Sequence, residues 1–176
     1  MHNYQVTQST TVYSGNIVDV VHDTITLPNG RNALREVVKH PGGAAVLPVD
    51  NDGNVILVRQ YRHPLGCMVL EIPAGMLNPG ETPQECAARE LEEEAGYRSA
   101  NVRPLAQISP SPGYLSERIH IYLATDLSAS RQNLDEEEFI EVAAYPLEEA
   151  VRMVFDGRIV DSKTVVAILA YSLKIR

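Results

Sequence analysis

The 176-residue sequence contains no tryptophan and only two cysteines, Cys67 and Cys86. Two thiols without a CxxC pair or a paired histidine are too few for a disulfide framework or a zinc site. No apolar run approaches the roughly 20 residues that span a bilayer, and the polar N-terminus lacks the features of a signal peptide. We therefore expect a reduced, cytoplasmic protein without a membrane partner, in which both cysteines are buried packing residues.

Positive charge is also scarce, because 15 Lys and Arg stand against 23 Asp and Glu, which gives a formal net charge of −8. Nucleic acid is therefore not an expected partner, since phosphate backbones are held by surplus lysine and arginine. A small anionic substrate remains compatible, because a bound metal ion supplies positive charge locally. The hydrophobic fraction of 44% suits an ordinary packed core.

Apolar patterns and turn signals predict a mixed α/β protein without a regular βαβ repeat. Asn29 and Gly30 are a strong hairpin signal, which predicts a small antiparallel unit within residues 1–40, followed by the main domain over residues 41–176. Strands are expected at residues 17–21, 24–27, 33–38, 44–49, 55–61, 68–72, 102–108, 119–124 and 139–145, and helices at 83–95, 147–155 and 162–173.

The helix at residues 83–95 has clear signals at both ends. Thr82 and Glu85 form a capping box, Pro83 suits the first helical position, and Gly96 suits the left-handed residue that ends a helix. Between these signals, small or apolar residues share one face at helical spacing: Ala87, Ala88, Leu91 and Ala95.

Another side of this helix, which we expect to be exposed, carries Glu90, Glu93 and Glu94. Acidic runs are often only solvated surface. Here, however, like charges at this spacing repel, and two of them lie in the last turn, where the helix dipole disfavours anions. A divalent cation would offset both effects, and carboxylate oxygens suit Mg²⁺, which also binds substrate phosphates.

These glutamates belong to a longer pattern that resembles the Nudix signature: a glycine, five residues, a glutamate, seven residues and then REUxEExGU. The matching residues are Gly75, Glu81, Arg89, Glu90, Leu91, Glu93, Glu94 and Gly96, with Tyr97 where the pattern usually has an aliphatic residue. The resemblance implies a Nudix hydrolase, with a mixed β-sheet sandwiched between helices. It also implies a Mg²⁺ cofactor, with Mn²⁺ as the alternative ion.

The resemblance also assigns roles to single residues. The metal ligands would be Glu90, Glu94 and the backbone carbonyl of Ala74, with support from Glu93. Arg89 and Glu81 would be charged partners that orient the ligand glutamates.

Outside the signature, the chain resembles the ADP-ribose and nucleotide-sugar pyrophosphatases over nearly its whole length. The matching segments are residues 59–62 (RQYR), 70–75 (LEIPAG) and 111–113 (SPG), with Pro112 sixteen residues after Gly96. The resemblance implies cleavage of the diphosphate of ADP-ribose or a related nucleotide sugar into a nucleoside monophosphate and a sugar phosphate. It further implies a homodimer, in which residues 1–40 are the dimerisation unit and residues 41–176 the catalytic domain.

Substrate-binding residues are expected in both parts of the chain. The planar fork of Arg62 suits phosphate oxygens, although an ordinary surface ion pair is the alternative. Arg35 in the N-terminal unit is a second candidate, which would serve the neighbouring subunit's site. Further positions align with substrate contacts in this group, with loop packing as an equal alternative: Met76, Ser111, Pro112, Gly113 and Glu117.

Hydrolysis also requires a base that takes a proton from water. The resemblance places a catalytic glutamate in the loop before residues 139–145 and a further metal ligand two residues later. We assign Glu136 as the base and Glu138 as the ligand, with a register shift of one residue as an alternative. If this loop is only a solvated acidic turn, Glu93 becomes the candidate base.

Two other functions stay open. One is hydrolysis of another nucleoside diphosphate derivative or a triphosphate. The other is a protein that binds ADP-ribose without cleaving it, against which the complete set of signature glutamates argues.

Overall fold

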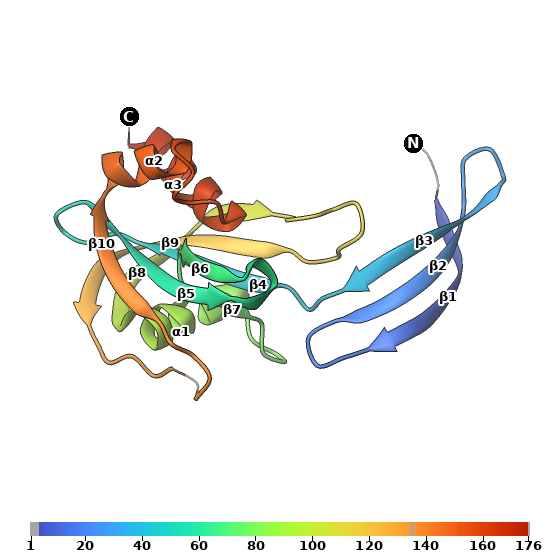
Figure 1. Cartoon of the computed structure of the whole chain (residues 1–176), viewed down its shortest axis with the longest axis horizontal. Helices are drawn as coiled ribbons and strands as arrows, with labels where there is room; N and C mark the ends of the chain where they lie inside the picture. Colours follow the sequence, from blue (N-terminus) through green and yellow to red (C-terminus); the bar gives the residue numbers. More distant parts are fainter. Residues whose placement is uncertain (1–3, 135, 176) are drawn as a thin grey trace. The chain divides into compact units, whose positions relative to one another are not determined.

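The computed structural model describes residues 4–134 and 136–175, and the chain divides into two compact units (Figure 1). One unit is Met1–Gly42 together with Ser109–Arg118, and the other is Gly43–Ile108 together with Ile119–Arg176.

The first unit is a three-stranded antiparallel sheet of β1 (Gln5–Ser14), β2 (Asp19–Thr26) and β3 (Asn32–Lys39), with β2 in the middle. The hairpin predicted at Asn29 and Gly30 joins β2 to β3, and Gly30 has the positive φ of 79° that such turns need. The sequence did not predict β1, because its ten residues are all exposed and show no apolar alternation. The two segments predicted at residues 17–27 form one continuous strand, β2.

The second unit contains two sheets and three α-helices. One sheet has the order β10-β5-β6, and the other has the order β7-β4-β9-β8, in which β4 and β9 are parallel and the remaining pairs are antiparallel. The strands are β4 (Gly43–Pro48), β5 (Asn54–Arg62), β6 (Cys67–Glu71), β7 (Ala74–Met76), β8 (Tyr97–Ile108), β9 (Ile119–Ala129) and β10 (Glu141–Pro146). The helices are α1 (Pro83–Ala95), α2 (Leu147–Phe155) and α3 (Ser162–Lys174), and a short 3₁₀ turn, η1 (His63–Leu65), joins β5 to β6.

Side chains from both faces of the central strands form the core. On β4, Ala45 and Leu47 pack with residues of α2 and α3, whereas Ala44 and Val46 pack with residues of α1. Strand β5 alternates in the same way between the two clusters. Because these strands are buried on both faces, they read in the sequence as continuous apolar runs. The expected layering, with strands between helices, is confirmed.

Two packing predictions were wrong. Cys67 is exposed at the start of β6, where the first two residues of the strand are both exposed, and only Cys86 is buried. Ala88, which we expected on the apolar face of α1, is also exposed. Within the described part of the chain, none of the helices has the length and apolar character needed to cross a membrane.

Candidate active site

Helix α1 is fixed at both ends by local contacts. At its start, the Thr82 hydroxyl accepts a hydrogen bond from the Glu85 backbone N–H, and the Glu85 carboxylate accepts one from the Thr82 backbone N–H. At its end, Gly96 has a φ of 71° and donates its N–H to the last carbonyls of the helix. The capping box and the left-handed glycine predicted from the sequence are therefore confirmed.

The glutamates of α1 do not form the exposed face that we expected. Glu90 is 7% exposed and Glu94 is 3% exposed, because the same turns carry buried residues that pack on β4 and β5. Glu93 lies between them in the sequence and is partly exposed. Two ionisable side chains therefore lie at the boundary of the core, where an isolated charge is costly.

Strand β7 packs closely against these carboxylates. The backbone N–H of Ala74 donates to Oε2 of Glu94 at 2.9 Å. A Cβ atom at Gly75 would collide with the carboxylate of Glu90, so this position accepts only glycine without a rearrangement. The glycine of the signature thus has a steric cause in this fold.

Arg89 holds three of the acidic residues together. Its Nε and Nη2 atoms donate to the two carboxylate oxygens of Glu81, and its Nη1 donates to Glu90 at 2.6 Å and to Glu93 at 2.8 Å. Hydrogen bonds from Arg89 are the main cause that lowers the pKa of Glu81 to about 2. Arg89 also donates to the backbone carbonyl of Met76, which ties the helix to the loop after β7.

Burial raises the pKa values of the two inner carboxylates, so their ionised forms are disfavoured while no cation lies beside them. It is the main cause that raises the pKa of Glu94 to about 8, with the negative charges of Glu90 and Glu138 adding to the effect. The pKa of Glu90 is also raised, mainly by burial, although Arg89 opposes the shift. A divalent cation would remove the penalty for ionising these groups.

The residues present therefore fit a hard, oxygen-binding cation in their chemistry. Their side chains are not already arranged around such an ion: across residues 4–134 and 136–175, no three His, Cys, Asp or Glu side chains form a ready ligand set. In this structure, the Arg89 guanidinium forms ion pairs with the carboxylates of Glu90 and Glu93. Arg89 binds only Oε1 of Glu90 and Oε2 of Glu93, so the second oxygen of each carboxylate is not engaged by Arg89.

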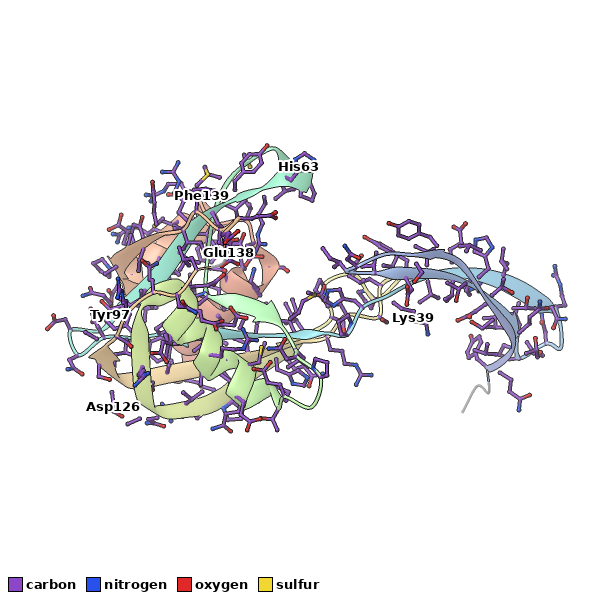
Figure 2. All side chains as sticks on the ribbon, turned by 90° about the horizontal axis from the view of Figure 1, so that it is seen from below. Lys39, His63, Tyr97, Asp126, Glu138 and Phe139 are labelled. Carbon is purple, nitrogen blue, oxygen red and sulfur yellow. The ribbon has the colours of Figure 1, made fainter. Side chains whose placement is uncertain are left out.

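The loop after β9 is attached to the C-terminal end of α1. Gln132 donates its side-chain amide to the backbone carbonyl of Glu94, and the Asn133 backbone N–H donates to the carbonyl of Glu93. Farther along this loop, the charge of Glu138 raises the pKa of both Glu90 and Glu94. Figure 2 labels Glu138 and the neighbouring Phe139 on this segment.

The structure thus brings Glu138 into the electrostatic field of the α1 glutamates. Glu136 and Glu137 are exposed in a turn of the same loop, and within residues 4–134 and 136–175 neither side chain makes a hydrogen bond or ion pair to α1.

Arg62, the predicted phosphate ligand, is held by a buried carboxylate. Its Nε and Nη2 atoms each donate to Glu71 at 2.8 Å, and Glu71 is only 2% exposed. Lys163 and Asp161, from the start of α3, complete this cluster. Sequence analysis gave no role to Glu71, Lys163 or Asp161. The available signal was the single charged residue, Glu71, in the otherwise apolar segment 68–72; the segment around Lys163 also contains Asp161, Ser162 and Thr164 and gave no such signal.

The other predicted substrate residues divide between the two units. Met76 lies in the second unit on β7 and is 45% exposed. Arg35 lies on β3 in the first unit, where its Nη1 donates to the backbone carbonyl of Leu34. The predicted loop positions belong to that same first unit: Ser111, Pro112, Gly113 and Glu117.

Contacts within the first unit hold this loop to the end of β3. The backbone of Val38 exchanges hydrogen bonds with Tyr114 and Ser116, and Glu117 lies 3.6 Å from the His40 ring. The structure therefore groups Arg35 and the Ser–Pro–Gly loop in one unit, and the α1 glutamates and Arg62 in the other.

Comparison with known proteins finds two family matches. Residues 39–166 match the NUDIX domain, and residues 4–38 match the nucleoside diphosphate sugar hydrolase N-terminal domain.

Individual relatives agree with these matches. The chain is 42% identical over 165 residues to an ADP-ribose pyrophosphatase of Bacillus subtilis, which covers 93% of this chain and 89% of that protein. It is 37% identical to an ADP-ribose pyrophosphatase of Mycobacterium tuberculosis, over 96% of this chain and 83% of that protein. The solved structure of an ADP compounds hydrolase superposes with a TM-score of 0.86 at 25% identity, covering 98% of this chain and 94% of the other.

Proposed function

The chain belongs to the NUDIX family, and from that premise we propose that it is a metal-dependent pyrophosphatase of ADP-ribose or a related nucleotide sugar. The products would be a nucleoside monophosphate and a sugar phosphate. The observation that carries the proposal is the pair of buried carboxylates, Glu90 and Glu94, held against the backbone of β7 at Ala74 and Gly75. Support for the substrate class comes from the two ADP-ribose pyrophosphatases that resemble the chain over most of its length.

We propose Mg²⁺ as the cofactor, with Mn²⁺ as an alternative ion. Carboxylate and carbonyl oxygens are the donors that Mg²⁺ prefers. When bound, the ion neutralises diphosphate charge and makes water more acidic. The ligands would be Glu90, Glu94, Glu138 and the backbone carbonyl of Ala74.

The remaining charged residues position these groups and move a proton. Arg89 and Glu81 keep the helix carboxylates oriented through the hydrogen bonds described above. Glu136 takes a proton from the attacking water as the water oxygen bonds to phosphorus and the anhydride P–O bond breaks. Glu93 is the alternative base, because it lies on α1 beside the proposed ligands.

Substrate contacts are proposed for residues of both units. In the second unit these are Arg62, whose guanidinium suits phosphate oxygens, and Met76. In the first unit they are Arg35, Ser111, Pro112, Gly113 and Glu117.

We also propose that the protein is a homodimer formed through its N-terminal sheet. This small sheet leaves large apolar side chains exposed, including Val6, Val12, Tyr13 and Leu34. It also buries Asp23 with one carboxylate oxygen that has no hydrogen-bond partner among the described residues. A second subunit that covers this sheet would account for the exposed apolar side chains. We further propose a reducing, cytoplasmic location, which is consistent with two free thiols.

A related substrate, GDP-mannose, is the second candidate. A GDP-mannose pyrophosphatase of Yersinia enterocolitica is 38% identical over 143 residues, which cover 75% of this chain and 74% of that protein. The test is a panel of ADP-ribose, GDP-mannose and nucleoside triphosphates with Mg²⁺, in which the products are identified by chromatography. AMP and ribose 5-phosphate from ADP-ribose at the highest kcat/KM is the expected result. Release of pyrophosphate from a triphosphate as the preferred reaction would contradict the proposal.

A further inference from the structure

A buried ion cluster joins the start of α3 to the strand that precedes the signature glycine. Lys163 is 7% exposed, and its ammonium group contacts Oε2 of Glu71 and lies 3.1 Å from Oδ1 of Asp161. The same Oε2 accepts a hydrogen bond from Nη2 of Arg62. Lys163 and Arg62 therefore share one carboxylate, although 101 positions separate them in the chain.

The charges of this cluster add up to zero only when Lys163 is present. Arg62 and Lys163 are positive, and Glu71 and Asp161 are negative. Without Lys163, two buried or half-buried carboxylates would face one guanidinium, and the cluster would carry one net negative charge. Such a cluster would repel an anion such as a diphosphate.

The geometry also leaves part of Arg62 available to a ligand. Glu71 binds Nε and Nη2, whereas Nη1 makes no hydrogen bond or ion pair within residues 4–134 and 136–175. The Arg62 side chain is 40% exposed, while the Glu71 side chain is 2% exposed. The charge of Glu94 raises the pKa of Arg62, and the charge of Arg62 lowers the pKa of Glu94. The Arg62 guanidinium therefore interacts electrostatically with the carboxylates of α1.

The neighbouring residue of α3 attaches to the same strand end. The Thr164 hydroxyl accepts a hydrogen bond from the Ile72 backbone N–H and donates one to Asp161, which also caps α3. The first turn of α3 thus contacts the chain at Glu71 and Ile72, two residues before Ala74. This attachment keeps Lys163 in place beside Glu71.

We propose that Lys163 is a positioning residue for substrate binding: by sharing the carboxylate of Glu71, it leaves the charge of Arg62 available to a diphosphate group. Lys163 itself does not contact the substrate. The inference rests on the proposed function only in taking a diphosphate as the anion.

Two single variants test this idea, because they change the cluster charge in opposite directions at the same helix end. Lys163→Met keeps the hydrocarbon stem and removes one positive charge, whereas Asp161→Asn keeps a capping oxygen and removes one negative charge. Affinity for inorganic pyrophosphate is measured by calorimetry with Mg²⁺, and folding is checked by thermal denaturation. We expect Lys163→Met to weaken binding about three- to tenfold and Asp161→Asn to strengthen it about two- to threefold, as for one partly screened unit charge. Lys163→Arg, which retains the charge, should stay within about twofold of the wild type.

A merely structural role would weaken binding in both variants or in neither, and either result would overturn the proposal. Asp161→Asn remains decisive if Lys163→Met does not fold, because an unchanged or weakened affinity contradicts the charge argument by itself.

The double variant Glu71→Gln/Lys163→Met tests whether Lys163 acts through Glu71. With Glu71 neutral, the loss of Lys163 should change pyrophosphate affinity less than it does in the wild-type background, whereas equal changes would exclude this route.

In steady-state kinetics with ADP-ribose, Lys163→Met should raise KM and Asp161→Asn should lower it, both at nearly constant kcat. Failure of the wild type to bind pyrophosphate would overturn the inference. Failure to cleave ADP-ribose, with pyrophosphate binding and the charge effects intact, would overturn only the proposed function.

Discussion

Replacing Glu94 by glutamine should stabilise the metal-free protein while removing most hydrolysis. Burial raises the pKa of Glu94 from 4.5 to about 8, so its ionised form is disfavoured in the folded state. One pKa unit corresponds to about 1.4 kcal/mol. Between acidic solution and pH 7, Glu94 therefore lowers the free energy of unfolding by about 3 kcal/mol. Glutamine retains an oxygen that can accept the Ala74 N–H, and it carries no charge.

The pH dependence follows from the sign of the shift. A carboxylate whose pKa is raised in the folded state contributes its full stability below the unfolded pKa, and this contribution is lost as the pH rises through the folded pKa. The difference between Glu94→Gln and the wild type should thus be small near pH 4.5, grow through neutrality, and level off above pH 8. We expect a gain of about 1–3 kcal/mol at pH 7.5, because the new amide does not recover every contact.

The measurement is urea unfolding in EDTA at several pH values, repeated with Mg²⁺. Mg²⁺ should stabilise the wild type, since a ligand that binds only the folded state raises its stability, and it should stabilise Glu94→Gln much less. Glu148→Gln is the matched control, because Glu148 is exposed on α2 and its replacement should change stability by about 0.5 kcal/mol or less. A Glu94→Gln protein that is less stable than the wild type in EDTA at pH 7.5 would refute the reasoning, as would near-normal turnover.

Three further predictions concern the base, the glycine and the assembly. Glu136→Gln should lower kcat by about 10²–10⁴-fold at nearly constant KM. If Glu136→Gln is active and Glu137→Gln or Glu138→Gln is inactive, the base is instead assigned to the later glutamate of the loop. Gly75→Ala should displace the Glu90 carboxylate, so steady-state assays should show a raised Mg²⁺ requirement together with a lowered kcat, and unchanged values for both would contradict the steric argument. Light scattering at micromolar concentration should give a homodimer, and a monomer would exclude a role for Arg35 at a neighbouring subunit.

Local features of the chain could be predicted because they depend on residues close together in the sequence. The capping box at Thr82, the glycine that ends α1 and the hairpin at Asn29 and Gly30 are set by backbone geometry over a few residues. Strands β4 and β5 were recognised from their apolar runs, whereas β1 was not. Every side chain of β1 is exposed in the described sheet, so no burial imposed an apolar pattern on its sequence.

The candidate site also combines features that could be predicted from the sequence with features that could not. The spacing of Gly75, Glu81 and the α1 glutamates was sufficient to identify the family and the residues of the motif, since a helix places residues three and four apart on one side. The sequence did not reveal that Glu90 and Glu94 are buried, because an acidic run looks solvated unless the packing of the surrounding turns is known.

The sequence by itself determined the family, the motif and the ends of α1, since each depends on short-range spacing and backbone conformation. Only the tertiary structure decided which distant charges meet. Glu71 and Lys163 are 92 positions apart, and their contact exists because α3 packs against the end of β6. The loop that carries Glu138 approaches α1 because backbone and side-chain hydrogen bonds attach it to the last turn of the helix. Such pairs depend on how elements pack, and neither partner's local sequence encodes the other.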